Sequence, residues 1–176
     1  MIPTPTYDYA RLATRLVSGE RSPGAHVAKG FLAGLIGGLV ATGVKHFAER
    51  YIATEAPDDE QAAGSLADKT AAALADRGLT PRQQAAAEAG LPWLFGGLIG
   101  GAYGAATELV PELKEGYGLA FGAAVYGVMH EGVLPAADIE APHAEKDPAE
   151  ERGELFSHLV YGVVTELTRT LVRPRV

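Results

Sequence analysis

The amino-acid sequence predicts an all-α fold, an integral membrane bundle of four transmembrane helices with Gly-rich close packing. Three observations lead to this prediction. Uncharged runs of 15, 19 and 14 residues begin at Gly30, Ala89 and Gly116. Glycines recur at i, i+4 spacing inside the first two runs, and charged residues gather between the runs. A 19-residue helix is about 28 Å long, close to the roughly 30 Å of a bilayer's hydrocarbon core.

Residues 1–27 form an amino-terminal arm in this prediction. Arg11, Arg15 and Glu20 interrupt the apolar core that a cleaved signal peptide would need, so the arm is not predicted to be one. Apolar residues recur at helical spacing on the side away from the arginines. The arm is therefore expected to be either a short helix at the membrane surface or a poorly ordered tail.

The membrane domain is expected over residues 28–172. The run that ends before Glu108 is the strongest candidate for a span, and the first run is bracketed by Lys29 and Lys45, whose long stems reach toward headgroups. The third and fourth segments are also apolar but carry histidine and glutamate. The four spans are predicted at about 28–47, 90–109, 116–137 and 155–172.

Two polar connectors and a tail complete the predicted organisation. The connector over 54–88 is Ala-rich, and Thr80 with Gln83 forms a capping-box pattern, which predicts two short helices outside the bilayer. The connector over 138–154 is acidic and contains prolines, so it is too polar to span. Residues 173–176 form a basic tail.

Charge sets expectations about partners and orientation. The net charge is -7, which argues against nucleic acid, because a phosphate-binding surface shows clustered Lys and Arg. The expected partners are the lipid bilayer and either a second copy of the chain or another membrane protein. Lys and Arg divide almost equally between the two sides of a four-span topology. The short basic arms beside the first and last spans favour cytoplasmic termini.

Glycine stripes predict where helices pack. Small residues allow close helix contact in lipid, whereas in water each glycine costs a helix about 1 kcal/mol relative to alanine. A soluble Ala-rich bundle is the alternative, favoured by a mean hydropathy of only +0.04. The residues predicted to pack are Gly34, Gly38, Gly96, Gly100 and Gly104.

Ionisable residues follow the same small-residue faces, which predicts an inward-facing polar cluster. Because consecutive spans run in opposite directions, Glu131 and His158 should lie on one side with Lys45, and Glu108 on the other side with Glu166. A structural role at a helix end is the alternative for each residue. The predicted cluster contains Lys45, Glu49, His130, Glu131, Glu154, His158 and Glu166.

The pattern Y-G-x-x-x-E occurs three times, beginning at Tyr103, Tyr126 and Tyr161. Tyrosine and glutamate are five residues apart, so on a helix they face different directions. The tyrosines are therefore predicted to pack or to anchor the helices rather than to take part in chemistry.

Two motifs carry a resemblance to a known family. One is G-x-x-x-G-x-x-x-x-x-x-K-x-x-x-E in the first span, and the other is GELFSHLVYGVVTELTR in the last. The matching residues are Gly34, Gly38, Lys45, Glu49, His130, Pro135, Glu154, His158 and Glu166. In these residues the chain resembles the YagU-like bacterial inner-membrane proteins, a domain of unknown function. The resemblance covers roughly 28–50 and 90–172 and implies an inner-membrane location with about four spans, but no reaction.

Three functions fit these observations. Titratable residues inside a bundle suit proton or ion handling, or they fix helix assembly. A membrane-embedded enzyme acting on a lipid headgroup is an alternative, with His130, His158 and Glu154 as candidate metal ligands. An accessory or structural subunit of a membrane complex is another alternative, in which the glycine stripes pack against partner helices. No catalytic residue or cofactor is assigned, and an enzyme is the less favoured reading.

Overall fold

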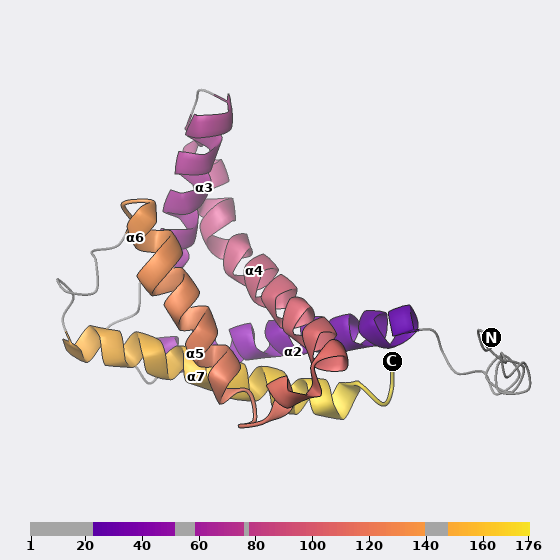
Figure 1. Ribbon diagram of the computed structural model, residues 1–176. Helices are drawn as coiled ribbons and strands as arrows, with labels where there is room; N and C mark the ends of the chain where they lie inside the picture. Colours follow the sequence, from indigo (N-terminus) through magenta and orange to yellow (C-terminus); the bar gives the residue numbers. More distant parts are fainter. Residues whose placement is uncertain (1–22, 52–58, 76–77, 140–147) are drawn as a thin grey trace, which may run out of the picture.

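The computed structural model describes residues 23–51, 59–75, 78–139 and 148–176 (Figure 1). Within these ranges the chain is all helical and forms no strand, so the predicted all-α class is confirmed. Residues 1–22 of the predicted arm and residues 140–147 of the second connector lie outside the described residues. In order, the elements are α2 (Pro23–Tyr51), α3 (Asp59–Ala75), α4 (Pro81–Leu109), the 3₁₀ turn η1 (Pro111–Lys114), α5 (Leu119–Val128), the π-helical turn η2 (Met129–Val133), α6 (Leu134–Ala136) and α7 (Pro148–Val172).

The second predicted span is part of a longer helix. The Thr80 hydroxyl accepts a hydrogen bond from the backbone N–H of Gln83, and the Gln83 side chain bonds back to the Thr80 backbone, so the predicted capping box is confirmed. The helix then continues without interruption through Pro92 to Leu109, instead of ending before a new span at residue 90. Its first part contains good helix formers, mainly Ala, Gln and Glu, which explains why no break occurs there.

The third predicted span is subdivided. A turn with positive φ at Gly116, Tyr117 and Gly118 precedes α5, so the helix begins at Leu119 rather than 116. From Met129 the helix widens into the π turn η2 before α6 ends it. The first and last helices begin earlier than predicted, at Pro23 and Pro148. Proline is favoured in the first turn of a helix, because an N–H there needs no intrahelical partner.

The long helices alternate in direction. Gly30 lies at Gly104 and Gly38 lies at Gly96, so α2 and α4 are antiparallel. Gly37 lies at Thr165 and His26 lies at Arg173, so α7 is also antiparallel to α2. Figure 1 shows α2 and α7 side by side, with α4 and α5 crossing over them. The helix α3 packs against the amino-terminal part of α4.

Glycine brings the backbones of α2 and α4 into direct contact. A Cβ added at Gly100 would lie 2.5 Å from the Gly34 carbonyl oxygen and 2.7 Å from the Gly38 Cα. One added at Gly34 would lie 2.8 Å from the Cα of Gly104. The two predicted stripes therefore pack against each other within one chain, and this pairing occupies the surface that a partner helix would otherwise use.

A second close contact joins α5 to α7, and the sequence analysis did not single it out. A Cβ added at Gly162 would lie 2.7 Å from the backbone N of Gly122, and Gly122 in turn packs on the backbone of His158. Gly118 has φ of 85° and abuts the Gly162 carbonyl, so it needs glycine for both conformation and space. This contact brings the start of α5 onto the middle of α7.

The three repeated tyrosines are buried and pack between the helices, as predicted. Tyr103 stacks on Phe121 with ring centroids 4.1 Å apart, and its hydroxyl donates to the Leu113 carbonyl at 3.1 Å. The Tyr161 hydroxyl donates to the Gly96 carbonyl at 2.6 Å, which ties α7 to α4. Tyr126 lies beside the histidines described below.

Many large apolar side chains are exposed, and several polar and charged ones are buried. Leu32, Ile36, Val40 and Val44 form one exposed stripe along α2 at four-residue spacing, with exposed fractions of 37–50%. The buried polar residues are Thr42, Thr107, His130, Glu154, His158, Thr165, Glu166 and Arg169. Soluble proteins usually show the reverse distribution, with apolar side chains buried and charged ones exposed.

One described helix is long and apolar enough to cross a membrane by length and composition, namely residues Gly24–Phe47 of α2. The other described helices do not meet that criterion. The four-span arrangement therefore stays a prediction.

Candidate functional site

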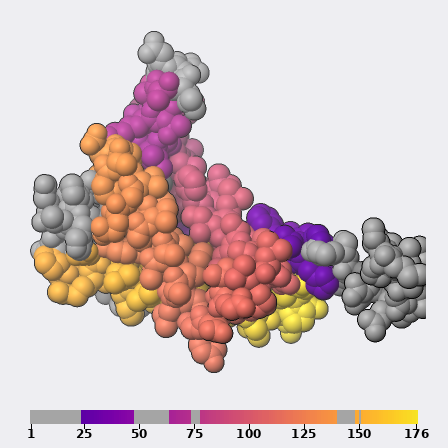
Figure 2. All heavy atoms as spheres, in the orientation of Figure 1, coloured from indigo at the N-terminus to yellow at the C-terminus, as the bar shows by residue number. Residues whose placement is uncertain are grey.

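A cavity of about 120 Å³ lies where α2, α4, α5, η2 and α7 meet. Leu66 of α3 lies over it, and Lys69 donates to the carbonyls of Ala137 and Asp138, so α3 bridges toward the end of α6. In the space-filling view, α5 and α6 lie next to α3 and α4 on this face (Figure 2). The cavity is partly open to the surroundings.

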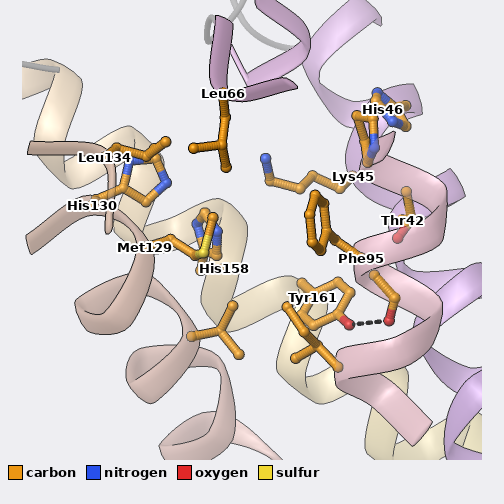
Figure 3. A pocket seen from close by; sticks show the side chains of 14 residues that line it. Thr42, Lys45, His46, Leu66, Phe95, Met129, His130, Leu134, His158 and Tyr161 are labelled. Carbon is orange, nitrogen blue, oxygen red and sulfur yellow. Dashed lines mark hydrogen bonds between the residues drawn. The ribbon is translucent and has the colours of Figure 1, made fainter. Parts of the chain in front are cut away.

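Basic and apolar side chains together line the cavity. His130 and His158 lie on one wall, and the amine of Lys45 extends toward them from the opposite wall (Figure 3). The apolar lining includes Phe95 from α4 and Met129 from η2. Three elements, α2, η2 and α7, therefore bring basic groups to a cavity that apolar residues also line.

The two imidazoles are in direct contact. The ring centroids of His130 and His158 are 4.9 Å apart with the rings nearly perpendicular. Nδ1 of His130 lies 3.5 Å from Oε2 of Glu154, and all three side chains are buried. When His130 is protonated, Glu154 can pair with it inside the protein. We call His130, Glu154 and His158 the histidine cluster.

The hydrogen bond of His158 fixes which of its nitrogens exchanges a proton. Nδ1 of His158 lies 2.9 Å from the Glu154 carbonyl oxygen one turn earlier in α7. Since a carbonyl only accepts, Nδ1 carries the hydrogen and donates it. The neutral ring then has its lone pair on Nε2, which is the atom that binds and releases a proton.

The π turn places His130 in this cluster. Turns of this kind are frequent at functional sites, because the extra residue changes the direction in which side chains project. Here the turn covers residues 129–133, and His130 is its buried member. Tyr126, one turn earlier, stacks on His130 at 5.3 Å and meets the edge of His158 at 5.9 Å.

The structure brings part of the predicted polar cluster together. Lys45, His130 and His158 line the cavity, and Glu154 contacts His130 beside it. Glu131 is exposed instead, and accepts a hydrogen bond from the Tyr126 hydroxyl at 3.4 Å. The side chain of Glu49 lies outside the described residues.

Glu166 belongs to a separate polar group. It forms a bidentate ion pair with Arg169, with both N–O distances 2.7 Å and both side chains buried. Close to this pair, Glu108 binds Arg173 at 2.6 and 3.1 Å and so joins the end of α4 to the end of α7. The predicted basic tail is therefore tied at its first residue to a neighbouring helix.

Among the described residues, no three His, Asp or Glu side chains are placed so that they could hold a metal ion.

A family model matches residues 35–167, more than half of the chain. The chain belongs to the DUF1440 family, whose members are described as proteins of unknown function. The matched region contains every residue named above as lining the cavity and the whole histidine cluster. Neither the curated proteins nor the solved structures include a significant match to the chain. The function proposed for this DUF1440 chain is therefore inferred from the geometry of the cavity and the burial of its side chains.

Sequence reasoning missed two features of the structure. The tyrosines were predicted to pack or to anchor helices, but the contact of Tyr126 with both histidines was not predicted, although Tyr126 precedes His130 by four residues and so shares its helical face. Arg173 was placed only in the basic tail, although it pairs with Glu108 across 65 positions. The spacing of Tyr126 and His130 was a local signal for the first contact. The Glu108–Arg173 pair had no such signal, because a pair between distant helices has no sequence pattern.

Proposed function

We propose that this DUF1440 chain is an integral membrane protein with four spans, whose buried histidine cluster binds and releases protons. The spans are α2, α4, the segment from α5 to α6, and α7. The observation that carries the proposal is the distribution of side chains, apolar outside and titratable inside. The chain also fits a YagU-like inner-membrane protein, on the resemblance of its first and last spans. The basic residues beside those two spans favour cytoplasmic termini.

The outer surface supports the membrane part of the proposal. Contiguous exposed apolar faces are rare on soluble monomers, and large ones mark contact with a membrane or a partner. The stripe from Leu32 to Val44 belongs to the helix that is apolar enough to span. Contact between helices through glycine is also typical of membrane bundles, because lipid gives no hydrophobic force to join them.

The interior supports the proton part. Ionisable groups inside a membrane protein are costly and typically mark a proton or substrate path. The imidazole rings of His130 and His158 are in contact, and Nδ1 of His130 lies 3.5 Å from Oε2 of Glu154. Nε2 of His158 carries the lone pair of the neutral ring, so it is the atom at which this ring exchanges a proton.

Proton flux into vesicles tests this function. Purified protein is placed in liposomes with a pH-sensitive dye inside, and a pH step is applied. Wild type should acidify the lumen faster than protein-free vesicles, and His158→Gln should reduce the rate to the protein-free level, because the exchanging Nε2 is lost. The matched control is His26→Gln. His26 lies near the start of α2 beside Arg173, whereas Lys45 of the cavity lies near the other end of that helix. This variant should retain wild-type flux. Equal flux from wild type and His158→Gln would contradict the proposal.

A membrane-embedded enzyme and an accessory subunit are the alternatives considered from the sequence. No specific geometric feature favours either of them. The pairing of the glycine stripes within one chain weakens the second, since those stripes are already in contact with each other.

A further inference from the structure

The helix α3 lies between the cavity and the protein surface. Leu66 is half-buried and lines the cavity, and Figure 3 shows its side chain reaching from α3 toward the space between His130 and Lys45. One turn later in the same helix, Lys69 and Thr70 are exposed. In the proposed membrane arrangement α3 belongs to the connector outside the bilayer. A single helix therefore separates this end of the cavity from water.

The start of α4 holds α3 closely. A Cβ added at Gly64 would lie 2.4 Å from Cγ of Glu88 and 2.6 Å from Nε2 of Gln84, so the two helices are in tight contact there. The Asp68 carboxylate accepts a hydrogen bond from the backbone N–H of Leu79, in the connection that leads into α4. Packing and a hydrogen bond together fix α3 on α4.

The Lys69 side chain joins α3 to the end of α6. Asp138 has a positive φ of 52°, and the backbone N–H of Ile139 donates to the Leu134 carbonyl at 3.0 Å, which ends the helix as in a Schellman motif. The last carbonyls of a helix have no partner within it. Here the amine of Lys69 donates to the carbonyls of Ala137 and Asp138.

These two contacts of α3 differ in how easily they break. The bonds made by Lys69 are exposed, so water can replace both partners and little free energy is lost when the bonds open. The contact with α4 is closely packed, and its hydrogen bond from Leu79 to Asp68 is partly buried. The helix α3 can therefore leave α6 while it stays on α4.

We propose that α3 is a lid on the cavity, in which Lys69 holds the closed position and Leu66 covers the end that faces water. When the Lys69 bonds break, α3 moves away from α6 and water reaches the histidine cluster. This inference deepens the proposed function by naming what controls access to its site. It rests on that function for the role of the site, and on the membrane arrangement for the aqueous side.

Cysteine labelling from water tests the lid. The chain has no cysteine, so Met129→Cys places a single thiol in the cavity lining and serves as the parent protein. The full chain is placed in lipid nanodiscs, and its reaction rate with a charged, water-soluble methanethiosulfonate reagent is measured. Adding Lys69→Met should raise this rate about three- to tenfold, because the closed position loses a charged hydrogen bond.

Three further variants separate the lid from indirect effects. Lys69→Arg keeps a charged donor on α3 and should label close to the parent rate. Lys114→Met removes a lysine from η1, which is not part of the cavity lining, and should leave the rate unchanged. Leu66→Ala removes the side chain that covers the cavity and should raise the rate although Lys69 is present.

A Lys69→Met protein that labels at the parent rate would overturn the proposal. So would a parent thiol that already reacts as fast as one at the exposed Glu112→Cys position, because the cavity would then be open with α3 in place. Lys69 is exposed, so its variant should keep the parent's thermal midpoint. Faster labelling with a lowered midpoint would reflect general unfolding and would also contradict the lid.

Labelling and proton flux are independent readouts. The labelling rate needs no proton gradient, so failure of the lid leaves the vesicle flux result untouched. Absence of flux from the wild type, conversely, would contradict the proposed function and leave the labelling rates as a separate observation.

Discussion

Gly100→Leu should abolish the native packing of α2 on α4. Any Cβ at this position meets the Gly34 carbonyl at 2.5 Å and the Gly38 Cα at 2.7 Å. These are backbone atoms, so no rotamer change can relieve the overlap. The cost should exceed the roughly 1 to 3 kcal/mol of ordinary overpacking, because two helices must separate. Size-exclusion chromatography in detergent should show aggregated protein without a monodisperse peak.

Gly90→Leu is the matched control for this substitution. It lies in the same helix, and a Cβ there has no atom within 4 Å. Replacing an unconstrained helical glycine should be neutral or stabilise the helix by about 1 kcal/mol. A monodisperse Gly100→Leu protein that melts at the wild-type temperature would contradict the packing described here.

Arg169→Ala should be the second strongly destabilising substitution. The guanidinium makes two 2.7 Å bonds to Glu166, and both side chains are buried. Removing it leaves a buried carboxylate without its counter-charge, which typically costs about 3 to 5 kcal/mol. Thermal unfolding in detergent should show a lower midpoint or no folded protein.

The double substitution Glu166→Leu with Arg169→Met tests the cause of that loss. Apolar replacement of both partners in a buried ion pair is often neutral or stabilising. The double variant should therefore melt well above Arg169→Ala. A double variant as unstable as the single one would show that Arg169 acts through its other contacts, and the assigned cost of the unpaired charge would be wrong.

Helix content and the glycine contact were accessible from the sequence because they depend on local pattern. The first two uncharged runs fall within α2 and the later part of α4, and the i, i+4 glycine stripes identified the faces that meet. The capping box at Thr80 identified the start of a helix. Each of these features is encoded within one continuous segment of the chain.

The subdivision of the third span was not accessible in the same way. An apolar run from residue 116 to 129 has no signal that distinguishes α5 from a longer helix, and nothing local marks the π turn at Met129. That turn depends on how the segment packs. Glu131 illustrates the consequence, because a helix without a π turn would have projected it in a different direction.

The cavity itself follows from arrangement rather than sequence. Lys45, His130 and His158 come from three different helical elements, and the sequence suggested only that they share one side of the bundle. Their separation depends on the angles at which α4 and α5 cross the other two helices. The apolar members of the cavity, such as Phe95 and Met129, were not distinguished from other span residues.

Site-directed spin labelling tests most directly whether titratable groups lie inside a membrane-embedded fold. The chain has no cysteine, so a single label can be attached at Val40→Cys on the exposed stripe of α2, with Glu112→Cys in η1 as the exposed polar control. In bilayers, the label at 40 should be more accessible to oxygen than to a water-soluble nickel complex, and the label at 112 should show the opposite. A label at 40 that the nickel complex reaches as readily as it reaches the one at 112 would contradict the membrane location.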